Sequence, residues 1–116
     1  MQKLRITAGG QTFSASLADR SAARALADLL PLSLDMTELN GNEKYGTLPQ
    51  SLPVQAERVG QICAGDLMLY GSDCLVLFYE SFRSGYRYTR LGKLDDAAGL
   101  AAAVGRGGVR VTIERA

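Results

Sequence analysis

Two hairpins stand out in the alternation of apolar and polar residues along the chain. In the first, over residues 3–17, apolar and polar side chains alternate on both sides of Gly9-Gly10, a pair that permits the positive φ angles of a tight turn. In the second, over residues 66–78, two β-prone runs flank the turn "GSD". Residues 75–79, "LVLFY", are apolar at every position, which predicts a central strand covered on both faces.

Four further stretches are predicted as strands, namely residues 32–39, 40–48, 86–94 and 108–115. The second of them begins with a turn, and the other three keep the two-residue period of a strand. Gly92 lies inside the third of these stretches. A glycine within a strand predicts a bulge or the close approach of another backbone segment. The chain is therefore rich in strands.

One helix is predicted early in the chain, where alanine and leucine recur at helical spacing over residues 19–31. Asp19 or Ser21 is the expected N-cap, and Pro31 is expected to end the helix. Residues 49–62 contain two prolines and little periodicity, so we expect a long surface loop there.

A second helix is predicted over residues 95–105, "DDAAGLAAAVG". Asp95 or Asp96 is the expected cap, and Gly105 is placed to stop the helix. The "GRGG" of residues 105–108 reads as a turn, because a phosphate-binding loop would need a strand before it and a helix after it.

The order of these elements, ββ, α, ββ, loop, ββ, β, α, β, indicates a mainly β fold in a single domain over residues 1–116. A parallel sheet of βαβ units does not fit, because most connections between strands are too short for a crossover. We predict a closed antiparallel β-barrel of about eight strands, capped by two α-helices.

Composition excludes several functional classes. The 116-residue chain has a net charge of +1, no histidine and no tryptophan. Without histidine, Ser-His-Asp and Cys-His catalysis and most zinc sites are excluded, and no cofactor or metal ion is expected. Without a basic stripe or an apolar run of about 20 residues, neither nucleic acid nor a membrane is an expected partner.

The two cysteines, Cys63 and Cys74, do not form a C-x-x-C motif. In the hairpin over residues 66–78, Cys74 faces Tyr70, and Cys63 lies beyond the paired region, so we expect two reduced thiols rather than a disulfide. The N-terminus has no apolar run behind its basic residues, as a signal peptide would. A cytoplasmic location is expected.

The chain resembles a cyclophilin in three segments, "GDLMLYG", "LVLFYE" and "YTRLGKLDDAAGLAAAV", and in its order of elements. In the third segment, residues 91–94 stand in the places of the cyclophilin Phe-Gly-Lys-Val. The segments "MTELNGNEKYG" and "GDLMLYGSDCLVLFYESF" look more similar still to the compact bacterial cyclophilin-like family. The resemblance implies the fold of the peptidyl-prolyl isomerases and a groove on its surface.

The chain departs from the cyclophilin pattern where that family carries its catalytic residues. No arginine occurs between Arg24 and Arg58, and the cyclophilin histidine falls at Tyr88. The cyclophilin Gln-Gly-Gly turn is replaced by "EKYG". Isomerisation needs a hydrogen-bond donor near the prolyl nitrogen, over a barrier of about 20 kcal/mol. Lys44 or Arg90 has a suitable donor, but neither lies in the matching position.

Candidate groove residues are the polar, aromatic and aliphatic strand positions that the resemblance places around the groove. They are Met36, Glu43, Lys44, Tyr45, Tyr70, Leu77, Phe78, Phe82, Tyr88 and Arg90. We expect the groove to lie between "EKYG", "LFYESF" and the loop over residues 49–60.

Residues 42–45 cannot form one site, because alternation along a strand places Glu43 and Tyr45 on one face and Asn42 and Lys44 on the other. Either one of these faces is a wall of the groove, or the stretch is a polar edge strand in which the lysine guards against edge pairing.

The aromatic candidates also have two interpretations. Either Leu77 or Phe78 forms the groove floor with Phe82 at the rim, or this strand belongs entirely to the core; a one-residue slip in register exchanges the two faces. The remaining tyrosines, at positions 70, 79, 86 and 88, suit either a ligand groove or ordinary strand composition.

Three functions follow from these observations. The favoured hypothesis is a binding module whose groove takes a peptide or small molecule without standard isomerase catalysis. The alternative is a weak or atypical prolyl isomerase, and the third is a structural or oligomer-forming domain. The sequence leaves the ligand and the oligomeric state open.

Overall fold

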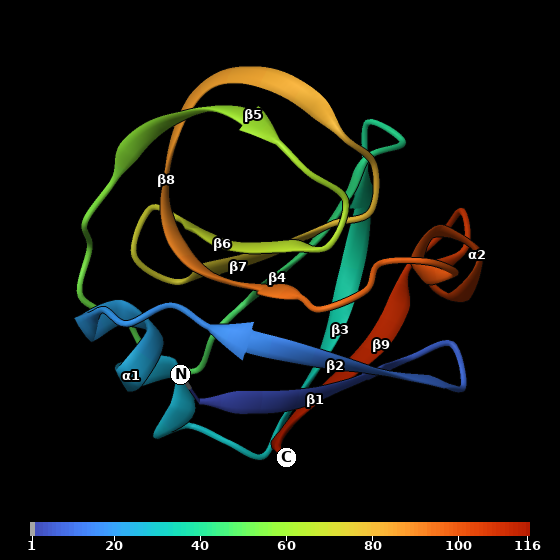
Figure 1. Ribbon diagram of the computed structural model, residues 1–116, viewed down its shortest axis with the longest axis horizontal. Helices are drawn as coiled ribbons and strands as arrows, with labels where there is room; N and C mark the ends of the chain where they lie inside the picture. The colour runs from blue at the N-terminus through green and yellow to red at the C-terminus, as the bar shows by residue number, and fades with distance from the viewer. Residues whose placement is uncertain (1) are drawn as a thin grey trace.

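A computed structural model describes residues 2–116 of the chain. Over these residues the protein has nine β-strands and two short helices (Figure 1). The strands are β1 (Lys3–Ala8), β2 (Gln11–Leu17), β3 (Leu32–Leu39), β4 (Glu43–Thr47), β5 (Glu57–Ile62), β6 (Asp66–Tyr70), β7 (Cys74–Phe78), β8 (Phe82–Leu94) and β9 (Val109–Arg115). The helices are α1 (Ser21–Ala27) and α2 (Leu100–Val104).

Eight of the strands form a closed antiparallel barrel. They pair in the order β2-β1-β9-β3-β4-β7-β6-β8, and pairing between β8 and β2 closes the ring. The two hairpins have the predicted registers, with Lys3 opposite Ser16 in the first and Tyr70 opposite Cys74 in the second. The prediction of a mainly β, closed barrel of about eight strands with two helices is confirmed.

Gly92 lies at the closing contact of the barrel, where it pairs with Leu17 of β2. A Cβ atom at this position would lie 2.4 Å from the backbone oxygen of Ser16, a distance that only glycine avoids. The expected close approach of another backbone segment is therefore confirmed, and it is the approach that completes the ring.

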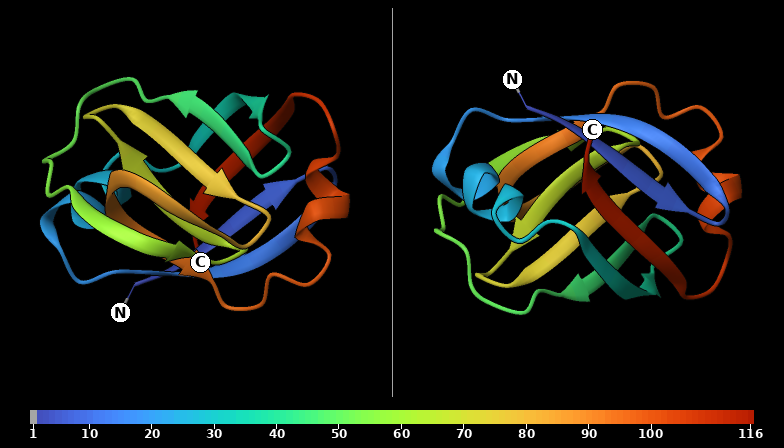
Figure 2. Two further views of the ribbon diagram at one scale, coloured as in Figure 1. Left: turned by 90° about the horizontal axis from the view of Figure 1, so that it is seen from above. Right: turned by 90° about the horizontal axis from the view of Figure 1, so that it is seen from below.

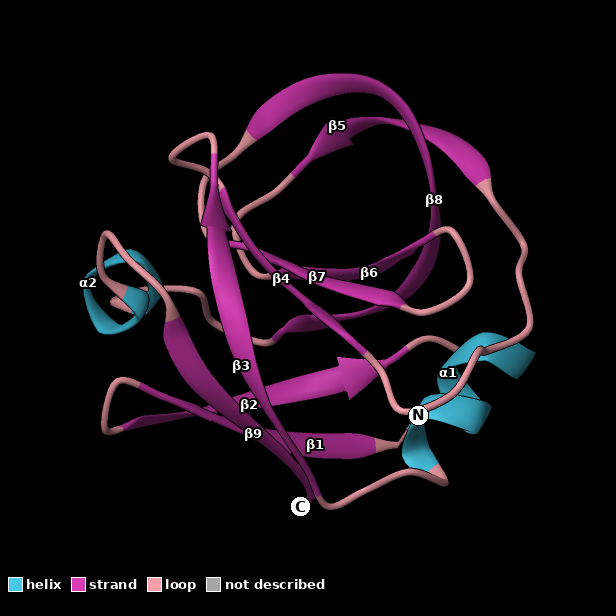
Figure 3. Ribbon diagram, turned by 180° about the vertical axis from the view of Figure 1, so that it is seen from behind, coloured by secondary structure: helices cyan, strands magenta, loops and turns pink. Residues whose placement is uncertain are grey.

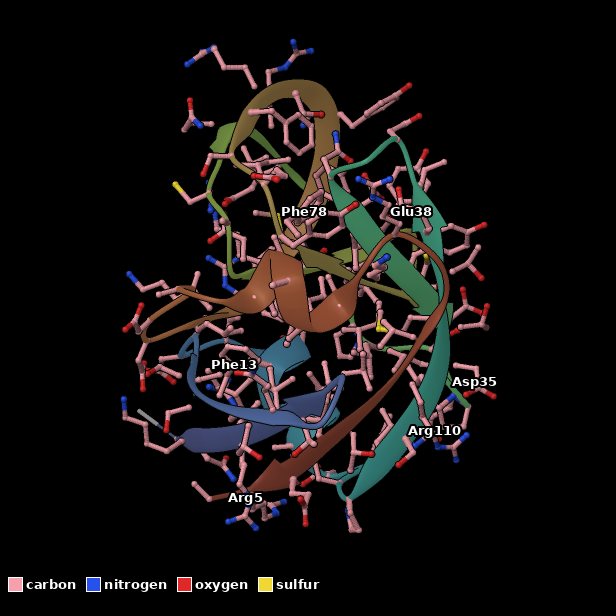
Figure 4. All side chains as sticks on the ribbon, turned by 90° about the vertical axis from the view of Figure 1, so that its right-hand side faces the viewer. Arg5, Phe13, Asp35, Glu38, Phe78 and Arg110 are labelled. Atoms are coloured by element: carbon pink, nitrogen blue, oxygen red, sulfur yellow. The ribbon has the colours of Figure 1, made fainter. Side chains whose placement is uncertain are left out.

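The fold contains two separate apolar clusters. The larger fills the barrel and includes Leu75 and Leu77 of β7, and the smaller lies outside the barrel and includes Val76 and Phe78 of the same strand. The prediction that this strand is covered on both faces is confirmed. Figure 4 labels one phenylalanine from each cluster, Phe13 in the barrel and Phe78 outside it.

The two helices lie on opposite sides of the barrel (Figure 3). Helix α1 is shorter than predicted and begins after Arg20, which forms no side-chain capping bond. The expected caps are wrong because Asp19 instead pairs with Arg24, at 2.8 Å between Oδ1 and Nη1. The helix ends before Pro31 because the N–H groups of Leu29 and Leu30 each bond to the carbonyl three residues back.

Helix α2 is also shorter than the predicted range of residues 95–105. It begins after Gly99, whose φ of +83° interrupts the helical backbone. The expected caps are wrong: Asp95 accepts a hydrogen bond from Ser16, and Asp96 accepts one from the backbone N–H of Ala98 before the helix starts. The predicted stop at Gly105 is confirmed. Within residues 2–116, neither helix has the length and apolarity needed to cross a membrane.

Part of the predicted surface loop over residues 49–62 is a strand, β5. Gly60 has a φ of +70°, and the pairing of β5 with β8 shifts register between Arg58 and Gly60. This bulge breaks the alternation of side chains, which is why the sequence pattern did not predict a strand.

Candidate binding pocket on the outer face of the barrel

The pocket is formed by the bending of β8 away from the barrel. Residues 89–94 of β8 pair with β6 within the ring, whereas residues 82–88 pair with β5. We call β5 together with residues 82–88 the arch. In Figures 1 and 2 the arch curves over the outer side of the sheet that contains β4, β6 and β7.

A cavity of about 520 Å³ lies between the arch and this outer face. Its walls come from the β3–β4 turn, from β4, from the β6–β7 hairpin and from the first half of β8. The lining residues are Leu39, Asn40, Asn42, Glu43, Tyr45, Tyr70, Cys74, Val76, Phe82, Arg83, Ser84, Gly85, Tyr86 and Tyr88.

A row of aromatic rings follows the pocket. Beneath it, the Phe78 ring lies 5.7 Å from that of Phe82 and 5.5 Å from that of Tyr88, measured between centroids. The row continues to Tyr70, 5.7 Å from Tyr88, and then to Tyr86, 6.4 Å from Tyr70. Phe78 and Tyr88 are buried and Phe82 is partly buried, whereas Tyr70 and Tyr86 at the rim are 50% and 65% exposed. The rim thus presents aromatic surface to solvent.

The carboxyl group of Glu43 lies on the pocket side of β4. The residue is only 8% exposed, and none of the lysines and arginines among residues 2–116 lies within 4 Å of its carboxylate. Burial, together with the nearby charge of Glu38, raises the pKa of the Glu43 carboxyl above its ordinary value. Glu43 is therefore a buried acid for which the described chain supplies no counter-ion.

Asn42 adds a second unsatisfied polar group to the pocket. Its side-chain oxygen Oδ1 is buried and has no hydrogen-bond partner among the described residues. Buried polar atoms in proteins nearly always have a partner, so an atom of this kind calls for a specific explanation. A ligand donor in the pocket would satisfy it if the side chain turned toward the cavity.

Arg83 is the cation among the lining residues, and it lies at the solvent-exposed rim. Its Nη2 atom is 3.9 Å from the place that a Cβ would occupy on Gly60 of β5. The guanidinium group is thus directed along the arch, and it forms no ion pair with Glu43.

Lys44 points to the opposite side of β4, toward the end of the barrel near α2. Its Nζ donates to the backbone carbonyls of Gly105 and Gly107, at 2.8 and 2.5 Å, and lies 3.0 Å from Oε1 of Glu38. The same carboxylate oxygen accepts a hydrogen bond of 2.7 Å from the hydroxyl of Tyr79. Figure 4 labels Glu38 on this side of the molecule.

Five of the ten predicted groove residues line the cavity, and five lie elsewhere. Those in the lining are Glu43, Tyr45, Tyr70, Phe82 and Tyr88. Met36 and Leu77 belong to the barrel interior, and Phe78 supports the pocket from beneath. Lys44 occupies the barrel end, and Arg90 pairs with Glu57 at 2.9 Å, so neither of the donors considered for isomerisation reaches the pocket.

Three further expectations about this region are wrong. The segment over residues 49–60 contributes no lining residue, because the arch lines the cavity with residues from 82–88 and not with β5. The stretch at 42–45 is not an edge strand, since β4 pairs with both β3 and β7. Of the two faces left open by alternation, the one carrying Glu43 and Tyr45 faces the pocket. The placement of Asn42 on the other face is wrong: it lies in the turn before β4, where alternation does not apply, and it also lines the pocket.

Sequence reasoning missed most of the segment from Arg83 to Tyr86, which forms one wall of the pocket. The sequence feature that could have indicated this wall is the "RSGY" stretch, where polar residues and a glycine interrupt two aromatic-rich runs. Leu39, Cys74 and Val76 were also missed as lining residues. Their sequence positions are those of ordinary strand residues, so only the pairing of β3, β4 and β7 brings them to one surface.

Comparison with known proteins agrees with this architecture. The solution structure of a hypothetical protein from Archaeoglobus fulgidus superimposes with a TM-score of 0.74 and 22% sequence identity, covering 99% of this chain and 95% of that one. No curated protein matches the sequence. The family model described as "Cyclophilin-like family" matches residues 6–114. The chain therefore belongs to the cyclophilin-like family.

Proposed function

We propose that this domain binds a small molecule or a peptide segment in the pocket beneath the arch. The observation that carries the proposal is the cavity itself, at about 520 Å³, lined by aromatic side chains with a few polar groups. Pockets that hold small ligands are generally about 300–1,000 Å³ in volume and have this mixture of lining groups.

The exposed aromatic rings at the rim support a binding role. Tyr70 and Tyr86 are half or more exposed, and neighbouring Leu39 is 41% exposed. A tyrosine combines a large apolar face with a polar hydroxyl and loses little conformational entropy when it is covered. Apolar surface gathered around a concavity is typical of a site that a partner covers.

The chemistry of the pocket differs from what standard prolyl isomerisation requires. A twisted prolyl amide is stabilised by a donor held at the imide nitrogen. Among the polar groups that line this pocket, the carboxylate of Glu43 and the amide oxygen of Asn42 have no hydrogen-bond partner among the described residues. Both are acceptors, so they favour ligands that bring donors of their own.

A specific observation also favours a second candidate, an atypical isomerase. Arg83 places a guanidinium group at the pocket rim, and no acidic side chain among the described residues pairs with it. A proline-containing peptide lying in the pocket would have a donor available there. The test is a protease-coupled isomerisation assay on Ala-Xaa-Pro peptides with the wild type and with Arg83→Ala. Rates at the uncatalysed level with protein in large excess would exclude this candidate.

The binding proposal is tested by thermal stabilisation across a panel of metabolites and short peptides. A ligand that binds only the folded protein raises its melting temperature in a concentration-dependent way. The comparison variants are Tyr70→Ala, at the pocket rim, and Val54→Ala, at an exposed apolar position outside the lining. We expect at least one compound to stabilise the wild type and Val54→Ala but not Tyr70→Ala.

Silence across the whole panel, or stabilisation that persists in Tyr70→Ala, would count against the proposal. Sedimentation measurements separate the remaining alternative. A concentration-dependent dimer that is lost in Tyr70→Ala would make the pocket an interface between copies of the chain, which contradicts a ligand site.

A further inference from the structure

We infer that the pocket selects a positively charged group, an ammonium or guanidinium that carries at least one N–H, with Glu43 as its counter-ion and the tyrosines as its walls. The inference rests on the proposed binding function and specifies the chemistry of the ligand. The cation is carried either by a free small molecule or by a side chain of a peptide.

Glu43 is the first observation. The Glu43 residue is 8% exposed and its carboxylate has no cation within 4 Å, so the charge loses much of its hydration without gaining a counter-ion, which is costly. Asp66 shows the ordinary solution: it is similarly buried, at 9% exposed, but its carboxylate accepts the backbone N–H of Cys63 at 2.9 Å. No hydrogen bond of this kind satisfies Glu43 within the described chain, so a ligand cation is the partner that would complete its surroundings.

The aromatic walls are the second observation. Tyr70 and Tyr88 lie side by side with centroids 5.7 Å apart, and Tyr86 stands edge-on to Tyr70 with an interplanar angle of 86°. The faces of aromatic rings carry negative charge density and attract cations, most strongly where water is excluded. Three rings set at different angles, in the same pocket as the Glu43 carboxylate, form the surroundings that an organic cation prefers.

The distribution of charge argues against an anionic ligand. An anion on the pocket floor would meet Glu43 and also the field of Glu38, whose charge acts on the same carboxyl group. The lining guanidinium, Arg83, lies at the exposed rim beside Gly60 rather than over the floor. A neutral ligand would leave Glu43 unpaired, so neither alternative removes the cost of burying it.

Asn42 refines the choice among cations. Its buried Oδ1 has no partner within the described chain, and a turn of the side chain toward the cavity would let it accept an N–H donor from a ligand. Primary, secondary and tertiary ammonium groups and guanidinium carry N–H donors, whereas a quaternary ammonium does not. We therefore expect guanidinium and alkylammonium ligands to bind more tightly than quaternary ones of equal size.

The experiment is an NMR titration of the full chain with matched pairs of probes. Butylguanidinium is compared with its neutral isostere butylurea, and choline with its neutral isostere 3,3-dimethylbutanol. The proteins are the wild type, Glu43→Gln, Tyr86→Ala and Val54→Ala. The first variant keeps the shape of the side chain and removes its charge, the second alters an exposed ring at the rim, and the third is the control outside the pocket.

We expect butylguanidinium to bind about tenfold or more tightly than butylurea, with shifts of pocket residues. The affinity for butylguanidinium should fall about tenfold in Glu43→Gln, which corresponds to about 1.4 kcal/mol, and should be unchanged in Val54→Ala. A capped peptide with a central arginine, titrated in parallel, identifies the source of the cation. Tighter binding of the peptide indicates a peptide ligand, and tighter binding of the free cation indicates a small molecule.

Equal binding of cations and neutral isosteres, or insensitivity to Glu43→Gln, would overturn the cation inference. If the probes fail but other compounds of the thermal panel bind in a Tyr70-dependent way, the cation inference fails and the binding function stands. If no compound of either set binds, both fail. Tyr86→Ala keeps the test informative if Glu43→Gln does not fold, because removal of a ring that is 65% exposed is expected to leave folding intact and to weaken the binding of butylguanidinium.

Discussion

Two consecutive residues of β4, Glu43 and Lys44, carry opposite charges, are both buried, and have opposite surroundings. Lys44 is 0% exposed and contacts Glu38 and the carbonyls of Gly105 and Gly107. Glu43 is 8% exposed and has no cationic partner among residues 2–116. Strand alternation sends the first to the end of the barrel and the second to the pocket.

The difference separates two uses of a buried charge. The partners of Lys44 come from β3 and from the segment that joins α2 to β9, so its burial ties distant parts of the chain together. Glu43 has no oppositely charged partner within the described chain, so its burial destabilises the folded state. Local costs of this kind in natural proteins concentrate at functional sites.

The largest expected effect comes from removing the charge at the barrel end. Lys44→Met should lower the free energy of unfolding by about 3 kcal/mol, because two carbonyls and Glu38 lose their buried donor together. The measurement is urea denaturation at neutral pH. Lys93→Met, at an exposed lysine, is the control and should change stability by less than about 0.5 kcal/mol. Equal changes in the free energy of unfolding for the two substitutions would contradict the structural role assigned to Lys44.

A change of opposite sign in the free energy of unfolding is expected for a substitution at Glu43, on the other side of β4. Glu43→Gln should raise the stability of the ligand-free protein at neutral pH by about 1 kcal/mol, because an amide is less costly to bury than an unpaired charge. Glu80→Gln, at an exposed glutamate, is the matched control. A destabilised Glu43→Gln would indicate that the carboxylate has a structural role after all.

The pH dependence of this effect follows from the raised pKa of Glu43. Between its ordinary value of 4.5 and the raised value, the folded state holds more protons than the unfolded state, so the contribution of Glu43 to stability falls as pH rises through that window. The titratable or charged groups around it are Glu38 and, among the pocket lining, Tyr45, Tyr70, Cys74, Arg83, Tyr86 and Tyr88. Denaturation curves at pH 4 to 8 should show this decline in the wild type and its absence in Glu43→Gln.

Glu38 should show the reverse pH dependence with a smaller amplitude. The hydroxyl of Tyr79, and then Lys44, hold the pKa of the Glu38 carboxyl below its ordinary value of 4.5. Its contribution to stability is therefore present above pH 4.5 and is lost as pH falls through the lowered value. Because the side chain is partly exposed, we expect less than about 1 kcal/mol. Denaturation of Glu38→Gln at pH 3 and pH 7 measures it, and a variant with the acid sensitivity of the wild type would contradict it.

The smallest effect on stability is expected at the rim. Tyr86 is 65% exposed, so Tyr86→Ala should change the free energy of unfolding by no more than about 0.5 kcal/mol. Thermal denaturation checks this value, with Val54→Ala as the control at another exposed apolar residue. A loss of several degrees in melting temperature would mean that the ring is a structural part of the arch rather than a surface available to a ligand.

Prediction from sequence succeeded where structure depends on neighbours along the chain. The hairpin of β6 and β7 follows from two β-prone runs around a short turn, and the division of Glu43 from Lys44 follows from strand alternation. It failed where pairing with a distant segment decides. Residues 57–62 looked like a loop because the bulge at Gly60 hides their period, and their partner is β8.

The sequence by itself determined that this chain folds as strands and hairpins, that β7 is apolar on both faces, and that two adjacent charges point in opposite directions. Those properties depend on residue type and on the two-residue period of a strand, which are local. Only the tertiary structure decided which charge is satisfied and which is left in a pocket. That depends on where the turn after α2 meets Lys44 and on how β8 bends into the arch above Glu43, and both arise from contacts between segments far apart in the chain.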